Sequence, residues 1–152
     1  MVHIIHRVGI KAAVQEVYQA LATTKGISNW WTKDTSGASE IGKTVVTRFH
    51  TLEGNEVGSM QFEIQGLEPD KKVHWKFLEG PQEWMGTEVI FELHQEEDYT
   101  IVLFRHINWA EEVEFKAHCS MKWAIFLLSL KQLVETGAGK PSPNDIKIDN
   151  WN

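Results

Sequence analysis

The alternation of hydrophobic and polar positions along the chain predicts a series of β-strands. The clearest case runs from residue 57 to 67, where Met60, Phe62 and Ile64 alternate with polar residues and therefore point to one face. The same period recurs in five other segments that short turns separate. The six predicted strands cover residues 2–10, 44–52, 57–67, the segment around 73–77, 87–95 and 99–107. Connections this short favour an antiparallel meander, because a parallel pair requires a crossover of a dozen or more residues.

The pattern changes to a helical period twice within the first third of the chain. Apolar residues at positions 14, 17, 18 and 21 predict a short amphipathic helix after the first strand. Thr23 or Thr24 can cap a second short helix that runs towards Trp30 and Trp31. The following segment, 32–41, is polar and is predicted to be a loop.

One long helical pattern, from about Glu111 to Glu135, follows the strands. Asn108 and Glu111 are candidates for a capping box at its start. At ~100° per residue, Ser129 lies on the polar side together with Lys122 and Gln132. The predicted core face contains Phe115, Cys119, Trp123, Phe126, Leu127, Leu130, Leu133 and Val134.

A second apolar patch lies on the opposite side of this helix. It consists of Met121, Ile125 and Leu128, where a simple surface helix would be polar. We expect the C-terminal tail, from about residue 140, to cover it, because Ile146, Ile148 and Trp151 alternate suitably. A symmetric dimer through the same patch is the alternative, and an exposed patch is the third possibility.

These elements predict an α+β protein, in which a curved antiparallel sheet of about six or seven strands wraps around the C-terminal helix. The length of 152 residues favours a single domain spanning the whole chain, 1–152. The seven Trp and seven Phe residues are large enough either to fill the space between sheet and helix or to line a cavity there. The sequence therefore supports a pocket more strongly than it supports any particular reaction.

Charge and cysteine content narrow the functional classes. The formal net charge is −6 and no basic run occurs, which argues against a nucleic-acid partner. The single Cys excludes an internal disulfide and fits a reducing compartment. No apolar run approaches the roughly 20 residues of a membrane span, and the first residues lack the features of a signal peptide. We therefore expect a cytoplasmic protein without a membrane span.

Several short motifs in this order resemble a known family. The chain is similar to the START-like (SRPBCC) superfamily and, within it, to the branch of the heat-shock protein 90 ATPase activator homologues, over residues 2–143. One departure is Met121-Lys122 before Trp123, where the branch often has a Gly, and the larger residue could narrow access near the helix. The motifs are Ala20-Leu21, Trp30-Trp31-Thr32 with Asp34-Thr35, the Gly80–Trp84 run with residues 86–89, His106 with Trp109, and the helix run from Lys122 to Pro141.

This resemblance implies a helix-grip fold and a cavity between the sheet and the long helix. It does not select one activity, because one fold supports many functions. We expect the cavity to bind a small hydrophobic or aromatic ligand, lipid-like or polyketide-like, without a cofactor. The candidate ligand-binding residues are Trp31, Phe49, Phe62, Trp75, Phe77, Trp84, Phe91, His106, Trp123, Phe126 and Leu127.

Catalytic signals in the sequence are weak. No histidine or cysteine pair has metal-ligand spacing, so no metal site is predicted. No nucleophile elbow, P-loop or dinucleotide motif occurs, and Cys119 is expected to be a small buried residue. His106 could act as an acid or base in a cyclase- or hydrolase-type enzyme if it faces the cavity; we expect instead a histidine at the core edge that hydrogen-bonds a backbone carbonyl.

A third functional hypothesis is a co-chaperone-like interaction domain. The name of the branch suggests heat-shock protein 90 as a partner. The chain shows no additional N-terminal domain of the kind that the eukaryotic activator carries, so we expect this partner less than a small apolar ligand.

Overall fold

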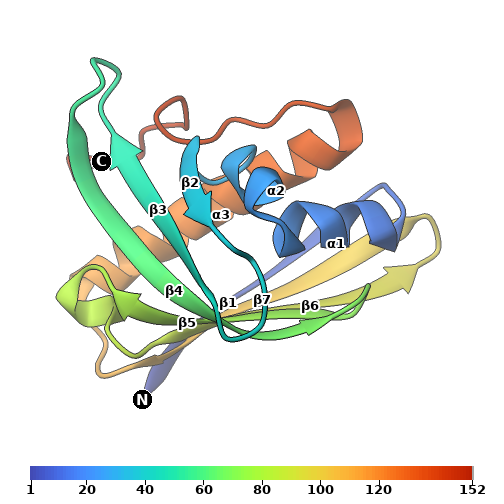
Figure 1. Ribbon diagram of the computed structural model, residues 1–152, viewed down its shortest axis with the longest axis horizontal. Coiled ribbons are helices and arrows are strands. Elements are labelled where there is room, and N and C mark those ends of the chain that lie inside the picture. Colours follow the sequence, from blue (N-terminus) through green and yellow to red (C-terminus); the bar gives the residue numbers. More distant parts are fainter. Residues whose placement is uncertain (152) are drawn as a thin grey trace.

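A seven-stranded antiparallel sheet curves around a long C-terminal helix in the computed structural model of the protein (Figure 1). The structure describes residues 1–151. The strand order β1-β7-β6-β5-β4-β3-β2 places the first strand beside the last, and every neighbouring pair is antiparallel. The strands are β1 (Val2–Ile10), β2 (Asp34–Gly37), β3 (Thr44–His50), β4 (Glu56–Glu68), β5 (Lys72–Glu79), β6 (Glu88–Glu96) and β7 (Tyr99–Trp109).

Three α-helices lie on the side towards which the sheet curves (Figure 1). The short helices α1 (Val14–Ala22) and α2 (Thr24–Ser28) follow β1, and α3 (Glu114–Thr136) follows β7. Thr23 caps α2, because its hydroxyl oxygen accepts a hydrogen bond from the Gly26 N–H at 3.0 Å. A short 3₁₀ helix, Gln82–Trp84, connects β5 to β6. The predicted α+β architecture, with two short helices after the first strand, is confirmed.

The segment 32–41 is not entirely a loop, as the sequence had suggested. Asp34–Gly37 forms β2 and pairs with Val45–Arg48 of β3. Hydrophobic alternation cannot reveal this strand, because it is short, polar and at the edge of the sheet, where little of its surface is buried.

The start of α3 and one of its faces also differ from the prediction. The helix begins at Glu114, with Val113 as its N-cap and no side-chain capping bond, so Asn108 and Glu111 do not form a capping box. Asn108 instead has a left-handed φ of 73° and donates a hydrogen bond to Glu88. Ser129 is buried rather than solvated, because the chain after the helix folds back and its hydroxyl accepts a hydrogen bond from the Lys140 N–H.

The C-terminal tail packs beside α3 but leaves the second apolar patch open. Asp145 reaches Lys122, and Trp151 packs on the ring of Phe115, with 6.4 Å between centroids. The side chains of Met121 and Leu128 remain 55% and 54% exposed. The expected cover by the tail is therefore wrong: the last residues of the tail border Met121 across an open hollow and do not cover it.

A continuous cluster of aromatic rings forms the core between the sheet and α3. Trp31, in the turn that follows α2, is at the centre of this cluster and stacks on Trp75 of β5 with 5.7 Å between centroids. It also contacts Trp123 of α3 at 5.1 Å, so one side chain connects three elements. Trp30 is fully buried, and its indole N–H donates to the carbonyl oxygen of Ala20 in α1. Rings of this size stabilise the fold mainly through the apolar area that they bury.

Candidate ligand-binding groove

A groove of about 910 Å³ opens at one end of the space between the sheet and α3. Its walls come from the β3–β4 hairpin, the β5–β6 connection, the first half of α3 and the C-terminal tail. Such a volume falls within the range of small-molecule sites, which are concave and mostly apolar with a few polar groups. Its Trp and Phe lining consists of Trp31, Phe49, Trp84, Phe115, Trp123, Phe126 and Trp151.

The eleven predicted ligand-binding residues divide into two groups. Five of them line this groove: Trp31, Phe49, Trp84, Trp123 and Phe126. The other six are not in its lining and are at most 2% exposed: Phe62, Trp75, Phe77, Phe91, His106 and Leu127.

The six residues of the second group lie in a closely packed interior. The rings of Phe62 and Trp75 are 4.3 Å apart, and that of Phe91 lies 5.0 Å from Trp75. Aromatic filling and an open site therefore coexist: large rings occupy the middle of the sheet, and the free space lies towards the β3–β4 hairpin.

Both ring nitrogens of His106 are committed to neighbours inside this interior. Nδ1 accepts a hydrogen bond from the Trp123 indole N–H at 3.1 Å. Nε2 therefore carries the proton and donates to the Thr87 hydroxyl at 2.8 Å, which donates in turn to the Trp84 carbonyl oxygen. Burial lowers the pKa of His106 to about 3. This histidine is neutral, fully bonded and outside the groove lining, which suits a structural role better than acid–base chemistry. It is fully buried and not at the core edge, and its partners are side chains where the sequence had suggested a backbone carbonyl.

Cys119 lies on the groove wall but is poorly suited to act as a nucleophile. Burial raises the pKa of its thiol to about 12, so almost no thiolate forms near neutral pH. Among residues 1–151, no three side chains of His, Cys, Asp or Glu converge to hold a metal ion.

The polar wall of the groove is formed where the tail meets α3. Lys122 pairs with Asp145, whose side chain is only 3% exposed. The ammonium group of Lys122 also lies 5.1 Å from the centre of the Phe126 ring. His118 pairs with Asp149 at 2.7 Å. These contacts place fixed charges beside the aromatic surface and hold the tail in position as a wall.

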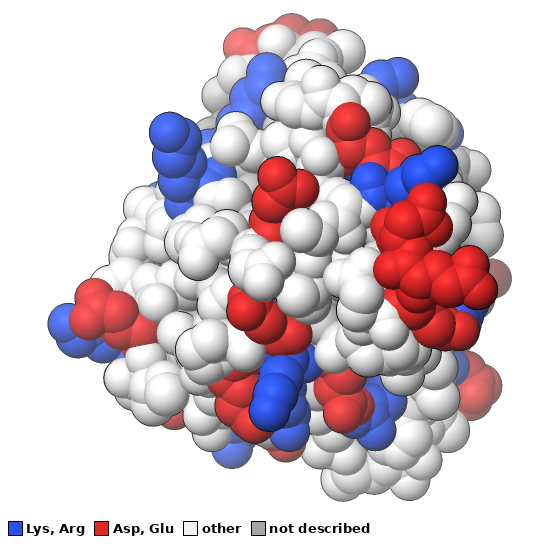
Figure 2. All heavy atoms as spheres, turned by 90° about the vertical axis from the view of Figure 1, so that its right-hand side faces the viewer, with Lys and Arg blue, Asp and Glu red and all other residues white. Residues whose placement is uncertain are grey.

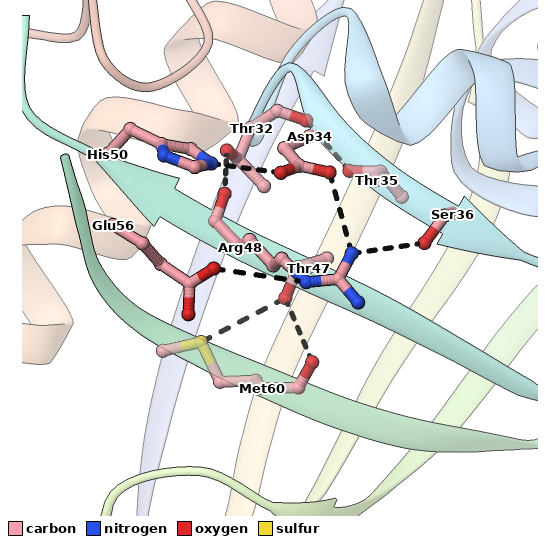
Figure 3. A network of polar contacts seen from close by, with 9 residues as sticks. All are labelled: Thr32, Asp34, Thr35, Ser36, Thr47, Arg48, His50, Glu56 and Met60. Atoms are coloured by element: carbon pink, nitrogen blue, oxygen red, sulfur yellow. Dashed lines mark hydrogen bonds and ion pairs between the residues drawn. The ribbon is translucent and has the colours of Figure 1, made fainter. Parts of the chain in front are cut away.

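A second polar cluster at the groove mouth was missed by the sequence analysis. Figure 3 shows the imidazole of His50 on β3 reaching Asp34 on β2, with 2.8 Å between Nε2 and the carboxylate. Arg48 lies 3.6 Å from the same carboxylate and 3.9 Å from Glu56. His50 belongs to the groove lining. The only signal was a histidine at the end of a predicted strand, and its partner lay in the segment predicted to be a loop.

The surface charge is mixed on the face of the molecule that Figure 2 shows. Figure 2 shows the end of the molecule at the right of Figure 1, where acidic side chains gather along one side and basic ones are scattered. This face offers no continuous basic surface of the kind that binds a phosphate backbone. Within the described part of the chain, no helix is long and apolar enough to cross a membrane.

The sheet wrapped around a C-terminal helix defines the class: the protein has the helix-grip fold of the START-like superfamily. The model of the family described as "Activator of Hsp90 ATPase homolog 1-like protein" matches residues 11–135, so the chain belongs to this family. A search of the curated proteins found no significant match.

Solved structures show the same fold. The Aha1 dimer from Colwellia psychrerythraea is 46% identical, with a TM-score of 0.78 over 91% of this chain and 100% of that one. A protein of Staphylococcus saprophyticus is 19% identical, with a TM-score of 0.72 over 91% of this chain and 95% of that one. CalU16 from Micromonospora echinospora is 23% identical, with a TM-score of 0.69 over 93% of this chain and 77% of that one. The last two show likeness of fold alone.

Proposed function

We propose that the protein binds a small apolar or aromatic molecule in the groove between the β3–β4 hairpin and α3. The observation that carries this proposal is the open groove of about 910 Å³ with aromatic rings from five parts of the chain. Trp31, Trp84 and Trp123 are at most 5% exposed and form the base of the groove. Phe49, Phe115 and Trp151 are more exposed, so an apolar guest would mainly remove the surface of these three rings from water. Lipid-like and polyketide-like molecules both fit this description. The single cysteine supports a cytoplasmic location as part of the same proposal.

Gly58 provides a direct test. It pairs with Phe49 across β3 and β4, so a side chain at position 58 would point to the face that Phe49 occupies. A Cβ at this glycine meets nothing within 4 Å. The Gly58→Trp variant should therefore fold and obstruct the groove.

The measurement is quenching of tryptophan fluorescence during a screen of lipids, polyketides and aromatic metabolites. We expect hits for the wild type that Gly58→Trp weakens at least tenfold. Gln65→Trp, on the exposed side of the same strand, is the control and should bind like the wild type. Hits that bind equally to all three proteins would contradict the groove as their site.

The family match supports a second candidate, an interaction with heat-shock protein 90. Stimulation of that protein's ATPase by this chain, measured together with a pull-down, tests the candidate directly. Stimulation that Gly58→Trp leaves intact would assign the activity to a surface other than the groove. If the chain neither stimulates the ATPase nor associates with heat-shock protein 90 at high concentration, the candidate is excluded.

An acid–base enzyme that uses His106 is less well supported. A catalytic group must contact its substrate, and both nitrogens of His106 are occupied inside the core. Retained turnover in a His106→Gln variant of any activity found later would exclude His106 as the acid or base.

We also propose that two copies associate through α3. Met121 and Leu128 are more than half exposed on one face of the helix, and Ile125 lies between them, partly exposed. The relative from Colwellia psychrerythraea, 46% identical, is described as a dimer. A second copy would remove this apolar face from water, which the tail does not do.

A further inference from the structure

His50 lies at the mouth of the groove because the pairing of β3 with β4 is irregular there. Strict alternation along β3 would turn His50 away from the face that Phe49 occupies. The register with β4 shifts between these two residues, and both belong to the groove lining. Irregularities of this kind often redirect a side chain beside a binding site.

The hydrogen bond to Asp34 leaves one nitrogen of His50 available. An ionised carboxylate only accepts hydrogen bonds, so the ring must donate from Nε2 to Asp34. In the neutral ring, Nδ1 then carries a lone pair and is an acceptor. Nδ1 has no hydrogen-bond partner among residues 1–151. The side chain is 27% exposed, so this acceptor is held in place and remains reachable.

The charges around His50 favour a donor over an anion. Asp34 and Glu56 carry two negative charges, and Arg48 between them carries one positive charge. Glu53 adds another negative charge to the groove lining. A carboxylate or phosphate group would be repelled at this end of the groove, whereas a neutral hydroxyl group would not.

We propose that His50, held by Asp34, is the polar anchor of the groove and that it selects aromatic ligands that carry a hydroxyl group, such as phenols. This inference rests on the proposed ligand-binding function. The aromatic body lies against Phe49, which is partly exposed and packs on the buried Trp31 with 5.7 Å between ring centroids, and its O–H donates to Nδ1 of His50. Asp34 acts as a positioning residue, because it fixes the tautomer and the orientation of the ring.

The test compares 1-naphthol with 1-methoxynaphthalene, which has the same ring system but no O–H donor. Isothermal titration calorimetry at neutral pH measures both dissociation constants. We expect wild-type protein to bind 1-naphthol roughly three- to tenfold more tightly, the range for one neutral hydrogen bond. His50→Leu should reduce this ratio to about one while 1-methoxynaphthalene binds as before, which also shows that the variant is folded. His94→Leu is the control, because His94 is an exposed histidine on β6 outside the groove lining.

Each outcome separates this inference from the function on which it rests. If both probes bind the wild type and His50→Leu keeps the preference for 1-naphthol, the anchor is wrong and ligand binding stands. If both bind the wild type equally, the anchor is also wrong. If neither probe binds the wild type, the inference fails together with the proposal that the groove accepts aromatic molecules.

Discussion

At the scale of single residues, burial determines what a histidine can do. His50 and His106 have the same side chain, but only His50 keeps a nitrogen without a partner. In the sequence, His106 is the candidate acid or base because it belongs to a motif of the resembled family and lies on a strand whose two faces are largely apolar. The completed hydrogen-bond chain around His106 assigns it to the core and leaves the polar chemistry of the groove to other residues.

The low pKa of His106 predicts a pH-dependent stability. The unfolded chain takes up a proton at its ordinary pKa of 6.5, whereas the folded protein does so only at about 3. The unfolded state therefore binds more protons in this window, and stability falls as the pH decreases from about 6.5 to about 3. Between about pH 7 and about pH 5, this group alone should lower the free energy of unfolding by about 2 kcal/mol.

Denaturant unfolding at both pH values, for the wild type and for His106→Gln, measures this contribution. The variant has no proton to gain, so its stability should depend less on pH by that amount. Carboxylates whose pKa the fold lowers, such as that of Glu135 through bonds from Lys11 and Lys131, affect both proteins equally. His94→Gln should behave like the wild type. Identical pH profiles for the wild type and His106→Gln would contradict the assignment.

A second residue-scale prediction concerns Gly139, where the tail leaves α3. A Cβ at this position would lie 2.6 Å from the carbonyl oxygen of Asn29 and 2.9 Å from that of Ser129. Both neighbours are backbone atoms and cannot rotate away, so Gly139→Ala should cost about 1–3 kcal/mol of stability. Gly58→Ala, where a Cβ has open space, should be neutral or stabilising. Equal melting temperatures for Gly139→Ala and the wild type would show that the chain can shift there.

At the scale of elements, the hydrophobic period of the sequence predicted the strands and helices that have one face buried in the core. The strands that carry Phe62, Trp75 and Phe91 are found where alternation placed them, because one face of each is buried. Period could not reveal β2, which is polar, or the start of α3, which follows an irregular segment. The groove depends on contacts across long sequence separations, such as Asp34 with His50 and Lys122 with Asp145, and no local pattern encodes them.

The tail is held by a buried ion pair, and a double-mutant cycle can measure its contribution. Lys122→Met leaves Asp145, 3% exposed at its side chain, with Lys147 at 3.7 Å as its one ion-pair partner among residues 1–151. Removing one partner of a buried pair strands a charge, so we expect a loss of about 3 kcal/mol. The double variant Lys122→Met/Asp145→Leu should recover most of it, because no charge remains buried. Thermal unfolding of the wild type, Lys122→Met, Asp145→Leu and the double variant gives the coupling free energy between the two side chains. Additive effects on stability would show that the pair is not desolvated.

At the scale of the whole molecule, one architecture leaves two different apolar surfaces available. The sheet and the tail enclose the groove on one side of α3, while Met121 and Leu128 face outwards on another. A ligand and a second copy could therefore bind at the same time. The groove belongs to each chain alone, so changes to the outer helix face should leave ligand affinity unchanged.

The outer face of α3 is suited to pack against itself. Ala117, Met121, Ala124 and Leu128 follow a spacing of three and four residues, the pattern of a helix–helix seam. A two-fold axis beside Ala124 would place Met121 of one copy opposite Leu128 of the other, so each contact occurs twice, as in other isologous dimers. Each buried apolar side chain contributes at most about 1.5–3 kcal/mol, and association itself opposes the gain, so we expect a dimer of moderate affinity.

Charge introduced on this face tests the dimer. The double variant Met121→Lys/Leu128→Lys should sediment as a monomer at concentrations where the wild type is dimeric, because each interface would bury four unpaired ammonium groups. Ile41→Lys, at an apolar position before β3 that is somewhat more exposed, at 64%, should remain dimeric. Sedimentation velocity over a range of concentrations gives the dissociation constants, and an unchanged melting temperature at low concentration shows that the fold is intact. A wild type that stays monomeric at the highest concentration, or a double variant that dimerises as well as Ile41→Lys, would contradict association through α3.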